Sequence, residues 1–282
     1  MSEKTVNINW FPGHMAKARR QMEEQLKGVD IVIELRDARI PDASANPMIG
    51  ELTRNKPVLV ILNKADLADP QQNRLWKERF EHCLICESTG KPIDKEVVNK
   101  VKEILKDKLE KAKARGIRKK VLRAMVAGIP NVGKSTFINN IVKKKAAKAE
   151  NRPGVTKSLQ WIRINDDVEL LDTPGVLWPK LENQDDARLL ALLGSIKDDI
   201  LDKEDLALFA LDYLKNEYPG TIRNRYEVDE EGDDLIEEIG RKKLLLDQNS
   251  TVNRKRTIDM ILKVIRNSRI GRISWQNAGK QI

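Results

Sequence analysis

One stretch of the sequence has the glycines, the lysine and the hydroxyl group that a phosphate-binding site requires. Residues 128–135, with the sequence GIPNVGKS, fit the phosphate-loop pattern in full, between an apolar run and a predicted helix. The glycines let backbone N–H groups surround phosphates, and the positive end of the helix adds to the attraction. We expect Lys134 to reach the β- and γ-phosphates and Ser135 to offer its hydroxyl to Mg²⁺. The other residues expected to contact the phosphates are Asn131, Val132, Gly133 and Thr136.

A second phosphate-sensing motif lies at residues 172–175 (DTPG), after a short apolar run that predicts a strand. In open α/β sheets, ligands bind at the carboxyl ends of the strands. We expect Asp172 to hold Mg²⁺, usually through water, and the amide of Gly175 to sense the γ-phosphate. Thr156 lies between the two motifs, where a switch loop should offer a hydroxyl to Mg²⁺. An ordinary Pro-Gly turn with a spare threonine is the alternative.

Residues 63–66 (NKAD) have the chemistry that selects a purine base. The carboxylate of Asp66 can accept hydrogen bonds from N1–H and the 2-amino group of guanine, and adenine offers neither donor. A buried acceptor left unpaired costs about 1–3 kcal/mol, so such a site favours guanine. We expect Asn63 to brace the loop and Lys64 to lie along the ring. The remaining expected base contacts are Ala65, Ser88 and Thr89, with a backbone amide of the ESTG stretch (87–90) offered to guanine O6.

These motifs occur in an unusual order. The base-reading tetrapeptide precedes the phosphate loop, whereas most GTPases have the two in the opposite order. The ligand is therefore expected to be GTP or GDP, and the chain to be circularly permuted. Such a permutation can preserve the neighbours in the sheet when the old termini lay close together. Because the chain leaves the nucleotide site directly after residues 172–175, we expect the GTP state to set the pose of the segment that follows.

The pattern of apolar runs predicts the elements that position these motifs. Apolar runs typical of buried parallel strands occur at 29–35, 58–62 and 121–127, with a short strand at 83–86 and a hairpin at 159–164 and 168–171. Helices are expected at 15–28, 70–81, 94–114 and from 134 onward. This alternation predicts an α/β fold over residues 1–180, a permuted phosphate-loop GTPase domain with a mostly parallel sheet and helices on both faces.

After about residue 183 the pattern becomes wholly helical, which predicts a small all-α domain over residues 181–282. Its helices are expected at 185–194, 203–216, 233–246 and 251–267. The last of these places an apolar stripe opposite Arg256 and Lys263. Such a basic outer face suits contact with an RNA backbone, and a merely solvated face is the alternative.

Charge also points to a polyanionic partner. The 282 residues include 52 Lys and Arg against 43 Asp and Glu, a formal net charge of +9. Much of the surplus lies at 106–123 and at 249–282, although a general solubility charge is the alternative. No apolar run is long enough to span a membrane, so no membrane partner is expected. The two cysteines, Cys83 and Cys86, suit a reducing cytoplasm and have no second pair of metal ligands.

The set resembles the ribosome biogenesis GTPase A family of circularly permuted GTPases. The likeness covers nearly the whole chain and includes residues 10–15 (WFPGHM), 37–39 (DAR), the phosphate loop and 171–175 (LDTPG). It is weakest around Ser88. The resemblance implies a cytoplasmic GTPase, expected to be monomeric, that binds the precursor of the large ribosomal subunit and its rRNA and promotes late 50S maturation.

Hydrolysis by the isolated chain is expected to be slow. Many GTPases place a Gln directly after the DxPG motif to orient the attacking water, and this chain has Val176 there. The resemblance implies that His14, together with Lys134 and Thr156, takes part in catalysis. It also implies that the ribosome stimulates hydrolysis. Packing of His14 on the aromatic residues near it, or contact with RNA, is the alternative. Asn131 matches the residue that potassium-stimulated GTPases use as an ion ligand, which makes K⁺ a further candidate cofactor; an Asn that suits the turn geometry is the alternative.

Three other functions compete with this interpretation. A signalling or transport GTPase would be supported by an apolar span or a lipidation signal, and a small-molecule kinase by an acceptor-substrate motif; none of these is evident. The third is a GTP-dependent RNA-binding scaffold with little intrinsic hydrolysis, which Val176 makes reasonable.

Overall fold

The computed structural model describes residues 20, 22–87, 90–142, 160–173, 183–196 and 202–279. These residues divide into two compact units. The first, the sheet unit, contains the described residues up to 173 together with 276–279, and the second, the helical unit, contains those from 183 to Trp275. Among the described residues no helix is long and apolar enough to cross a membrane.

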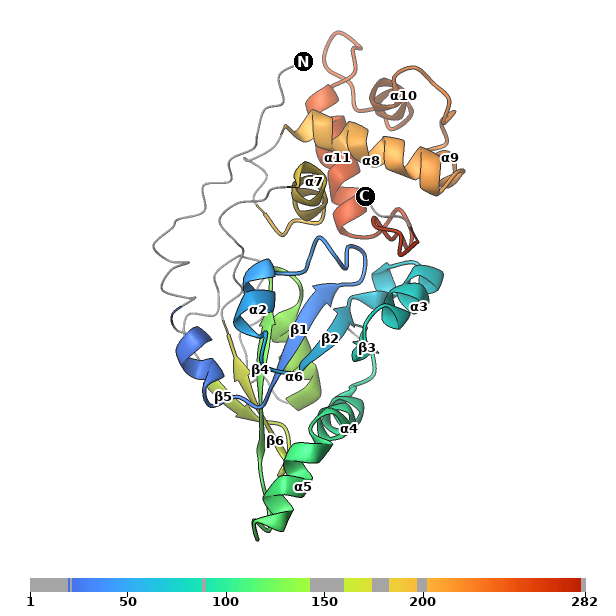
Figure 1. Ribbon diagram of the computed structural model, residues 1–282. Helices are drawn as coiled ribbons and strands as arrows, with labels where there is room; N and C mark the ends of the chain where they lie inside the picture. The colour runs from blue at the N-terminus through green and yellow to red at the C-terminus, as the bar shows by residue number, and fades with distance from the viewer. Residues whose placement is uncertain are drawn as a thin grey trace. The chain divides into compact units, whose positions relative to one another are not determined.

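The sheet unit is built on six strands in the order β3-β2-β1-β4-β6-β5 (Figure 1). They are β1 (Ile31–Asp37), β2 (Val58–Asn63), β3 (Cys83–Ile85), β4 (Leu122–Gly128), β5 (Gln160–Arg163) and β6 (Val168–Asp172). Only β5 runs antiparallel to its neighbour, and the other pairs are parallel. The predicted mostly parallel α/β sheet is confirmed.

The register of the parallel strands brings the predicted motifs to one edge of the sheet. Asp37 at the end of β1 lies opposite Asn63 at the end of β2. Leu35 lies opposite Gly128, where the phosphate loop begins. Asp172 at the end of β6 lies opposite Val126 of β4. Because all four strands point the same way, their carboxyl ends converge, as ligand sites of such sheets require.

Helices cover both faces of the sheet, as predicted. In the sheet unit they are α2 (Pro47–Leu52), the 3₁₀ turn η1 (Ala65–Leu67), α3 (Pro70–Glu78), α4 (Asp94–Ile104), α5 (Lys106–Ala114) and α6 (Lys134–Val142). α2 and α3 each begin with a proline after a capping side chain, from Asn46 and Asp69. The single helix expected over 94–114 is instead two helices, because the backbone departs from helical geometry at the buried Leu105.

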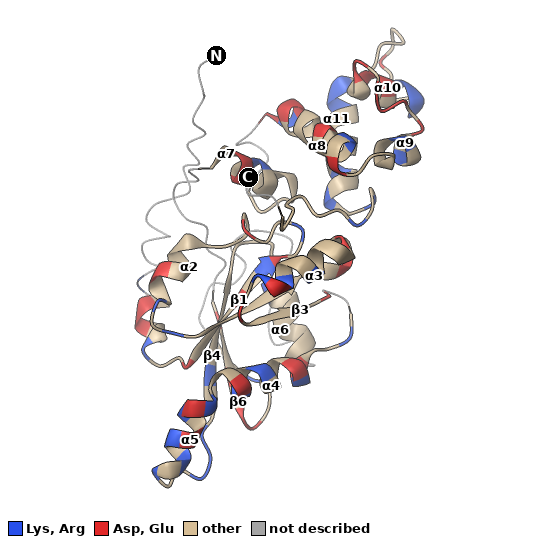
Figure 2. Ribbon diagram, turned by 45° about the vertical axis from the view of Figure 1, so that its right-hand side comes forward, with Lys and Arg blue, Asp and Glu red and all other residues tan. Residues whose placement is uncertain are grey.

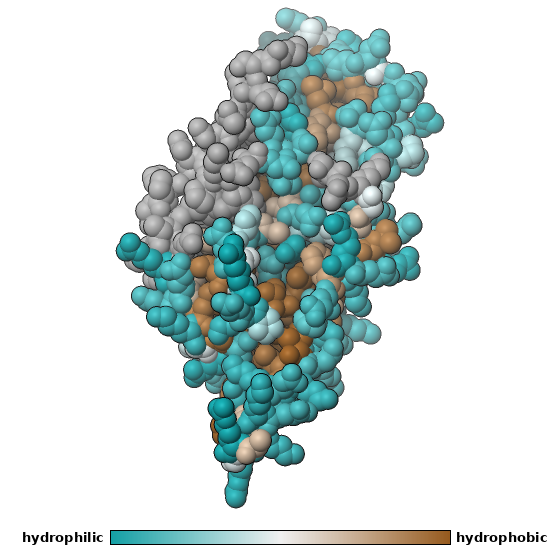
Figure 3. Space-filling model, in the orientation of Figure 1, coloured by the Kyte–Doolittle hydropathy of each residue, from teal (hydrophilic) through white to brown (hydrophobic). Residues whose placement is uncertain are grey.

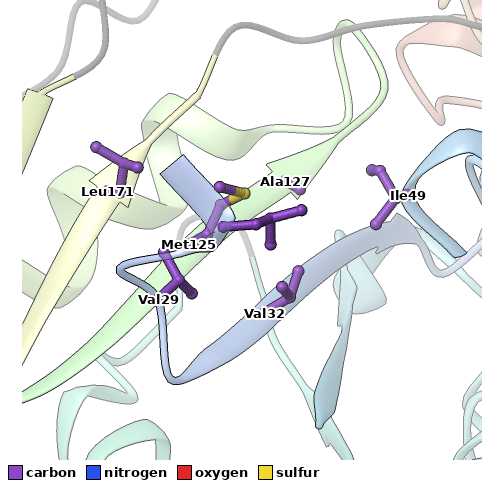
Figure 4. Close-up of a cluster of buried hydrophobic side chains, with 7 residues drawn as sticks. Val29, Val32, Ile49, Met125, Ala127 and Leu171 are labelled. Carbon is purple, nitrogen blue, oxygen red and sulfur yellow. The ribbon is translucent and has the colours of Figure 1, made fainter. Parts of the chain in front are cut away.

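One face of the sheet packs a continuous apolar cluster (Figure 4). It joins Val32 of β1, Met125 and Ala127 of β4, and Leu171 of β6 with Ile49 of α2. The same face continues over β2 to α3, whose Trp76 is buried. α6 packs against β4 and beside α4 on the opposite face of the sheet. The strand residues that alternate with those of the cluster point toward this opposite face. This core therefore fixes the strands whose carboxyl ends form the site.

The helical unit packs around one helix. Its elements are α7 (Gln184–Leu192), α8 (Lys203–Glu217), α9 (Thr221–Tyr226), α10 (Leu235–Lys242) and α11 (Arg254–Arg266). α11 contacts α7, α8 and α10, and its stripe of Ile258, Ile261, Leu262 and Ile265 is buried, as the pattern predicts. The pattern of apolar residues did not predict α9. Its start depends on Glu230, whose carboxylate accepts hydrogen bonds from the backbone N–H groups of Gly220, Ile222 and Arg223.

The chain returns to the sheet unit after the helical unit. The predicted helical domain extended to residue 282, whereas Gln276 and residues 277–279 belong to the sheet unit. The Oε1 atom of Gln276 accepts from the backbone N–H of Asp42 and of Ala43, each at 3.0 Å. The indole of Trp76 donates to the Gln276 carbonyl oxygen at 3.1 Å. The chain's return to the sheet unit is fixed by side-chain hydrogen bonds, which leave no periodic pattern in the sequence.

We expect Gln276→Ala to lower the stability of the sheet unit by about 1–3 kcal/mol, because it removes the acceptor of two backbone donors. Urea unfolding followed by tryptophan fluorescence would measure the loss. Gln248→Ala is the matched control, since Gln248 is exposed. Equal unfolding midpoints for the two variants would contradict this account of the segment.

Candidate nucleotide-binding site

The two glycines of the phosphate loop lie where no side chain fits. A Cβ on Gly128 would lie 2.8 Å from the Leu35 carbonyl oxygen of the neighbouring strand. Gly133 has φ +94°, and a Cβ there would lie 2.5 Å from the amide nitrogen of the Asn63 side chain. Close approach of backbone to neighbours is the physical reason for glycine at both positions.

Lys134, at the end of this loop, forms an ion pair with Asp172. The Lys134 ammonium lies 3.4 Å from a carboxylate oxygen of Asp172, and both side chains are buried. Burial lowers the pKa of Lys134, and the charge of Asp172 partly offsets that shift. The structure thus brings together the two predicted phosphate motifs, which are 38 residues apart in the sequence. Ser135 and Thr136 lie in the first turn of α6 and are half-buried.

The donor set at this edge fits Mg²⁺ better than a metal held by protein alone. Asp172 is a single buried carboxylate, and Ser135 adds a hydroxyl oxygen nearby in the sequence. Across the described residues no group of three or more His, Cys, Asp or Glu is placed to hold a metal ion. Mg²⁺ is commonly bound by one or two carboxylates together with substrate phosphates and water, which matches this arrangement.

The base-reading tetrapeptide is tied directly to the phosphate loop. The Asn63 side chain donates to the Val132 carbonyl oxygen at 2.8 Å. Its own amide oxygen is buried and has no hydrogen-bond partner among the described residues. Lys64, in the left-handed region with φ 59°, donates to the carbonyl oxygen of Asn131 at 2.6 Å. These two contacts fix the spacing between the place for a base and the place for phosphates.

Two neighbouring segments hold the loop after Asn63 through hydrogen bonds. Ala65 donates its N–H to the Cys86 carbonyl oxygen at 3.1 Å. The Asn73 side chain of α3 donates to the Ala65 carbonyl oxygen at 2.9 Å. Asp66 is half-buried within η1. Asn73 was not among the predicted site residues, because a single Asn inside a helical pattern carries no signal of its own.

Comparison with known proteins indicates the family of this chain. A family model described as 50S ribosome-binding GTPase matches residues 123–249, which include the phosphate loop but not residues 63–66. The ribosome biogenesis GTPase A of Bacillus pumilus is 43% identical, over 96% of this chain and 99% of the relative. The protein of the same name from Priestia megaterium is 44% identical, over 96% of this chain and 97% of its own length.

The chain belongs to the ribosome biogenesis GTPase A family. A solved structure, GNP-bound YlqF from Thermotoga maritima, has the same fold with a TM-score of 0.67 and 24% identity, covering 94% of this chain and all of that one. The predicted permuted GTPase fold with a C-terminal all-α part is therefore confirmed. The partial match of the family model is what permutation produces, since the base-reading motif precedes the matched stretch.

Five predicted site residues of this GTPase lie outside the described residues: His14, Ser88, Thr89, Thr156 and Gly175.

The two cysteines belong to the core. Cys83 and Cys86 are free and buried, and burial raises their thiol pKa values to about 11 and about 12. Thiols with such pKa values are protonated and inert near neutral pH, so both act as core residues.

We expect Gly133→Ala to weaken GDP binding more than tenfold, because the new methyl group would displace the Asn63 side chain from the phosphate loop. Isothermal titration with GDP measures the effect. Gly116→Ala is the control: Gly116 also has positive φ, +79°, but open space surrounds its Cβ position. Equal GDP affinity in the two variants would show that the close approach at Gly133 is unimportant.

Proposed function

We propose that this chain binds GTP, hydrolyses it, and acts in assembly of the large ribosomal subunit. The observation that carries the proposal is the direct link between the base-reading tetrapeptide and the phosphate loop. An ATP-binding loop needs no such tetrapeptide. The names of the relatives, ribosome biogenesis GTPase A, support the cellular role.

Each site residue has a role in this proposal. Asp66 accepts from guanine, and Lys134 places positive charge beside the β- and γ-phosphates. The other nucleotide contacts are Asn63, Lys64, Ala65, Ser88, Thr89, Asn131, Val132, Gly133, Thr136 and Gly175. Ser135, Thr156 and Asp172 would hold Mg²⁺, which when bound neutralises the charge on the phosphate oxygens. Asn131, half-buried in the loop, would be the ligand of K⁺.

In hydrolysis, a water attacks the γ-phosphorus, and the bond between that phosphorus and the bridging oxygen breaks, so that the oxygen leaves with GDP. Because the buried Lys134 is fixed beside Asp172, its positive charge is in place before the reaction and needs no rearrangement. The position after the DxPG motif is Val176, which cannot orient a water. His14 would supply that function, and the ribosome would stimulate it.

Exposed positive charge on both units supports an RNA partner. In the helical unit Lys255, Arg256 and Lys263 of α11 are exposed. Figure 2 shows the Lys and Arg positions along α11 in blue. Arg254 and Arg266 are not equally available: Arg254 pairs with Glu204 and Asp234, and Arg266 donates to carbonyl oxygens at the end of α7. In the sheet unit Lys111 and Lys113 of α5 are exposed, and the surface over α5 is mostly hydrophilic (Figure 3). We propose that rRNA contacts these exposed cations, with the protein a cytoplasmic monomer.

The test is co-sedimentation with precursors of the large subunit under GDP, GTP and a non-hydrolysable GTP analogue. We expect most binding with the analogue and least with GDP, because the helical unit follows directly on the γ-phosphate-sensing motif. Equal binding in all three states would contradict coupling of GTP state to RNA contact. Turnover in the same samples, in KCl and in NaCl, separates an enzyme from a scaffold, which would show no stimulation by the particles.

A matched pair of triple variants tests the RNA surface in that assay. Lys255→Glu, Arg256→Glu and Lys263→Glu together should reduce co-sedimentation at least tenfold, since each reverses a charge beside phosphate. The control reverses three exposed cations of the sheet unit that lie outside α5, namely Arg74, Lys91 and Lys95. Equal loss in both variants would indicate a general charge effect rather than a docking face.

A further inference from the structure

The tripeptide Asp37-Ala38-Arg39 has no role in the function proposed so far, although it adjoins the site. It ends β1, directly beside the base-reading tetrapeptide. Asp37 lies opposite Asn63 in the strand register, and the N–H of Ala38 donates to the Asn63 carbonyl oxygen at 2.8 Å. The end of β1 is therefore joined through the backbone to the start of the base-reading loop.

Asp37 and Arg39 form a buried ion pair with three hydrogen bonds. The guanidinium of Arg39 donates to the two carboxylate oxygens at 2.9 and 2.7 Å. The backbone N–H of Arg39 adds a third bond to the first of these oxygens, at 3.1 Å. Their side chains are only 2% and 3% exposed, respectively. A bidentate arginine fixes the plane of a carboxylate as well as its position.

The oriented carboxylate makes one further contact, with the base-reading loop. The second oxygen of Asp37 accepts from the Lys64 ammonium at 3.0 Å. The same ammonium donates to the Asn131 carbonyl oxygen of the phosphate loop. Lys64 is thus held between a fixed carboxylate on β1 and the loop that would surround the phosphates.

The positive charges of this cluster favour the ionised form of Asp37. Burial alone would raise the pKa of Asp37, but Arg39 and Lys64 outweigh it and hold that pKa well below its usual range. Burial lowers the pKa of Lys64, and the negative charge of Asp37 opposes that shift. Removing the carboxylate would leave a buried ammonium beside the Arg39 cation.

We propose that Asp37 is a positioning residue for guanine nucleotides, which holds Lys64 against the phosphate loop, and that Arg39 orients Asp37 for this purpose. The inference rests on the proposed guanine site. Without Asp37, the Asn131 carbonyl oxygen would be the remaining hydrogen-bond acceptor of Lys64 among the contacts described. Lys64 would then leave its place beside the base, and GDP and GTP would both bind less tightly.

The test is Asp37→Asn, which keeps the shape of the side chain and removes its charge. We expect at least tenfold faster release of a fluorescent GDP analogue, measured by stopped flow, and a matching loss of affinity for GTP. Unchanged release would overturn the proposal.

Glu34→Gln is the matched control for loss of a buried ion pair. Glu34 lies on the same strand, is buried, and pairs with Arg36 at 2.8 Å, away from Lys64. We expect it to lower stability as Asp37→Asn does but to leave release of the analogue within twofold of the parent. If both variants released nucleotide equally fast, the effect of Asp37 would be structural, and the proposal would fail.

A double-mutant cycle shows whether Asp37 acts through Lys64. Lys64→Met alone should accelerate release, and adding Asp37→Asn should then change it less than twofold. Additive effects would overturn the proposal while leaving the guanine site intact. No effect of Lys64→Met would instead count against the proposed role of Lys64 in that site.

Arg39→Lys covers the case in which Asp37→Asn does not fold. It keeps the positive charge but removes the two-point hold on the carboxylate. We expect at least threefold faster release in the parent and none of this acceleration in the Lys64→Met background. Unchanged release in the parent background would contradict the orienting role of Arg39.

Discussion

The site depends on the contact of Asn63 and Lys64 with the backbone of the phosphate loop. Asn63 is hydrogen-bonded to a residue 69 positions away in the sequence, and Lys64 to one 67 positions away. They fix the distance at which a base and a chain of phosphates can be bound together. The glycine at 133 exists because the Asn63 side chain comes so close, and the register of β1 with β2 and β4 sets that approach.

This constraint explains why a permuted chain keeps the site. Neighbouring strands, rather than neighbouring residues, supply the contacts, so the order β3-β2-β1-β4-β6-β5 matters more than the order in which the chain visits it. Permutation places the helical unit directly after β6, whose last residue, Asp172, is paired with Lys134. The segment after the helical unit then returns to the sheet unit, where Gln276 is bound by backbone donors at residues 42 and 43.

The sequence predicted the sheet, its helices and the meeting of both phosphate motifs because periodicity and glycine spacing report on local geometry. It did not predict the role of Asn73 or the proposed roles of Asp37 and Arg39, since Asp37 and Asn73 act through side-chain contacts with other segments and Arg39 acts through Asp37. The break at Leu105 and the return of Gln276 were missed for a related reason: tertiary packing overrides a continuous helical pattern at the first, and hydrogen bonds without periodicity fix the second. Motif spacing therefore located the site, and tertiary contacts revealed what holds it.

Nucleotide selectivity tests the guanine site most directly. Asp66→Asn replaces two acceptors by one acceptor and one donor, which suits the N1–H and the 2-oxo group of xanthine instead of the 2-amino group of guanine. Competition binding with GDP and xanthosine diphosphate would measure the change. The account predicts that the parent prefers GDP and that the variant prefers xanthosine diphosphate, each at least tenfold. An unchanged preference for GDP in the variant would contradict it.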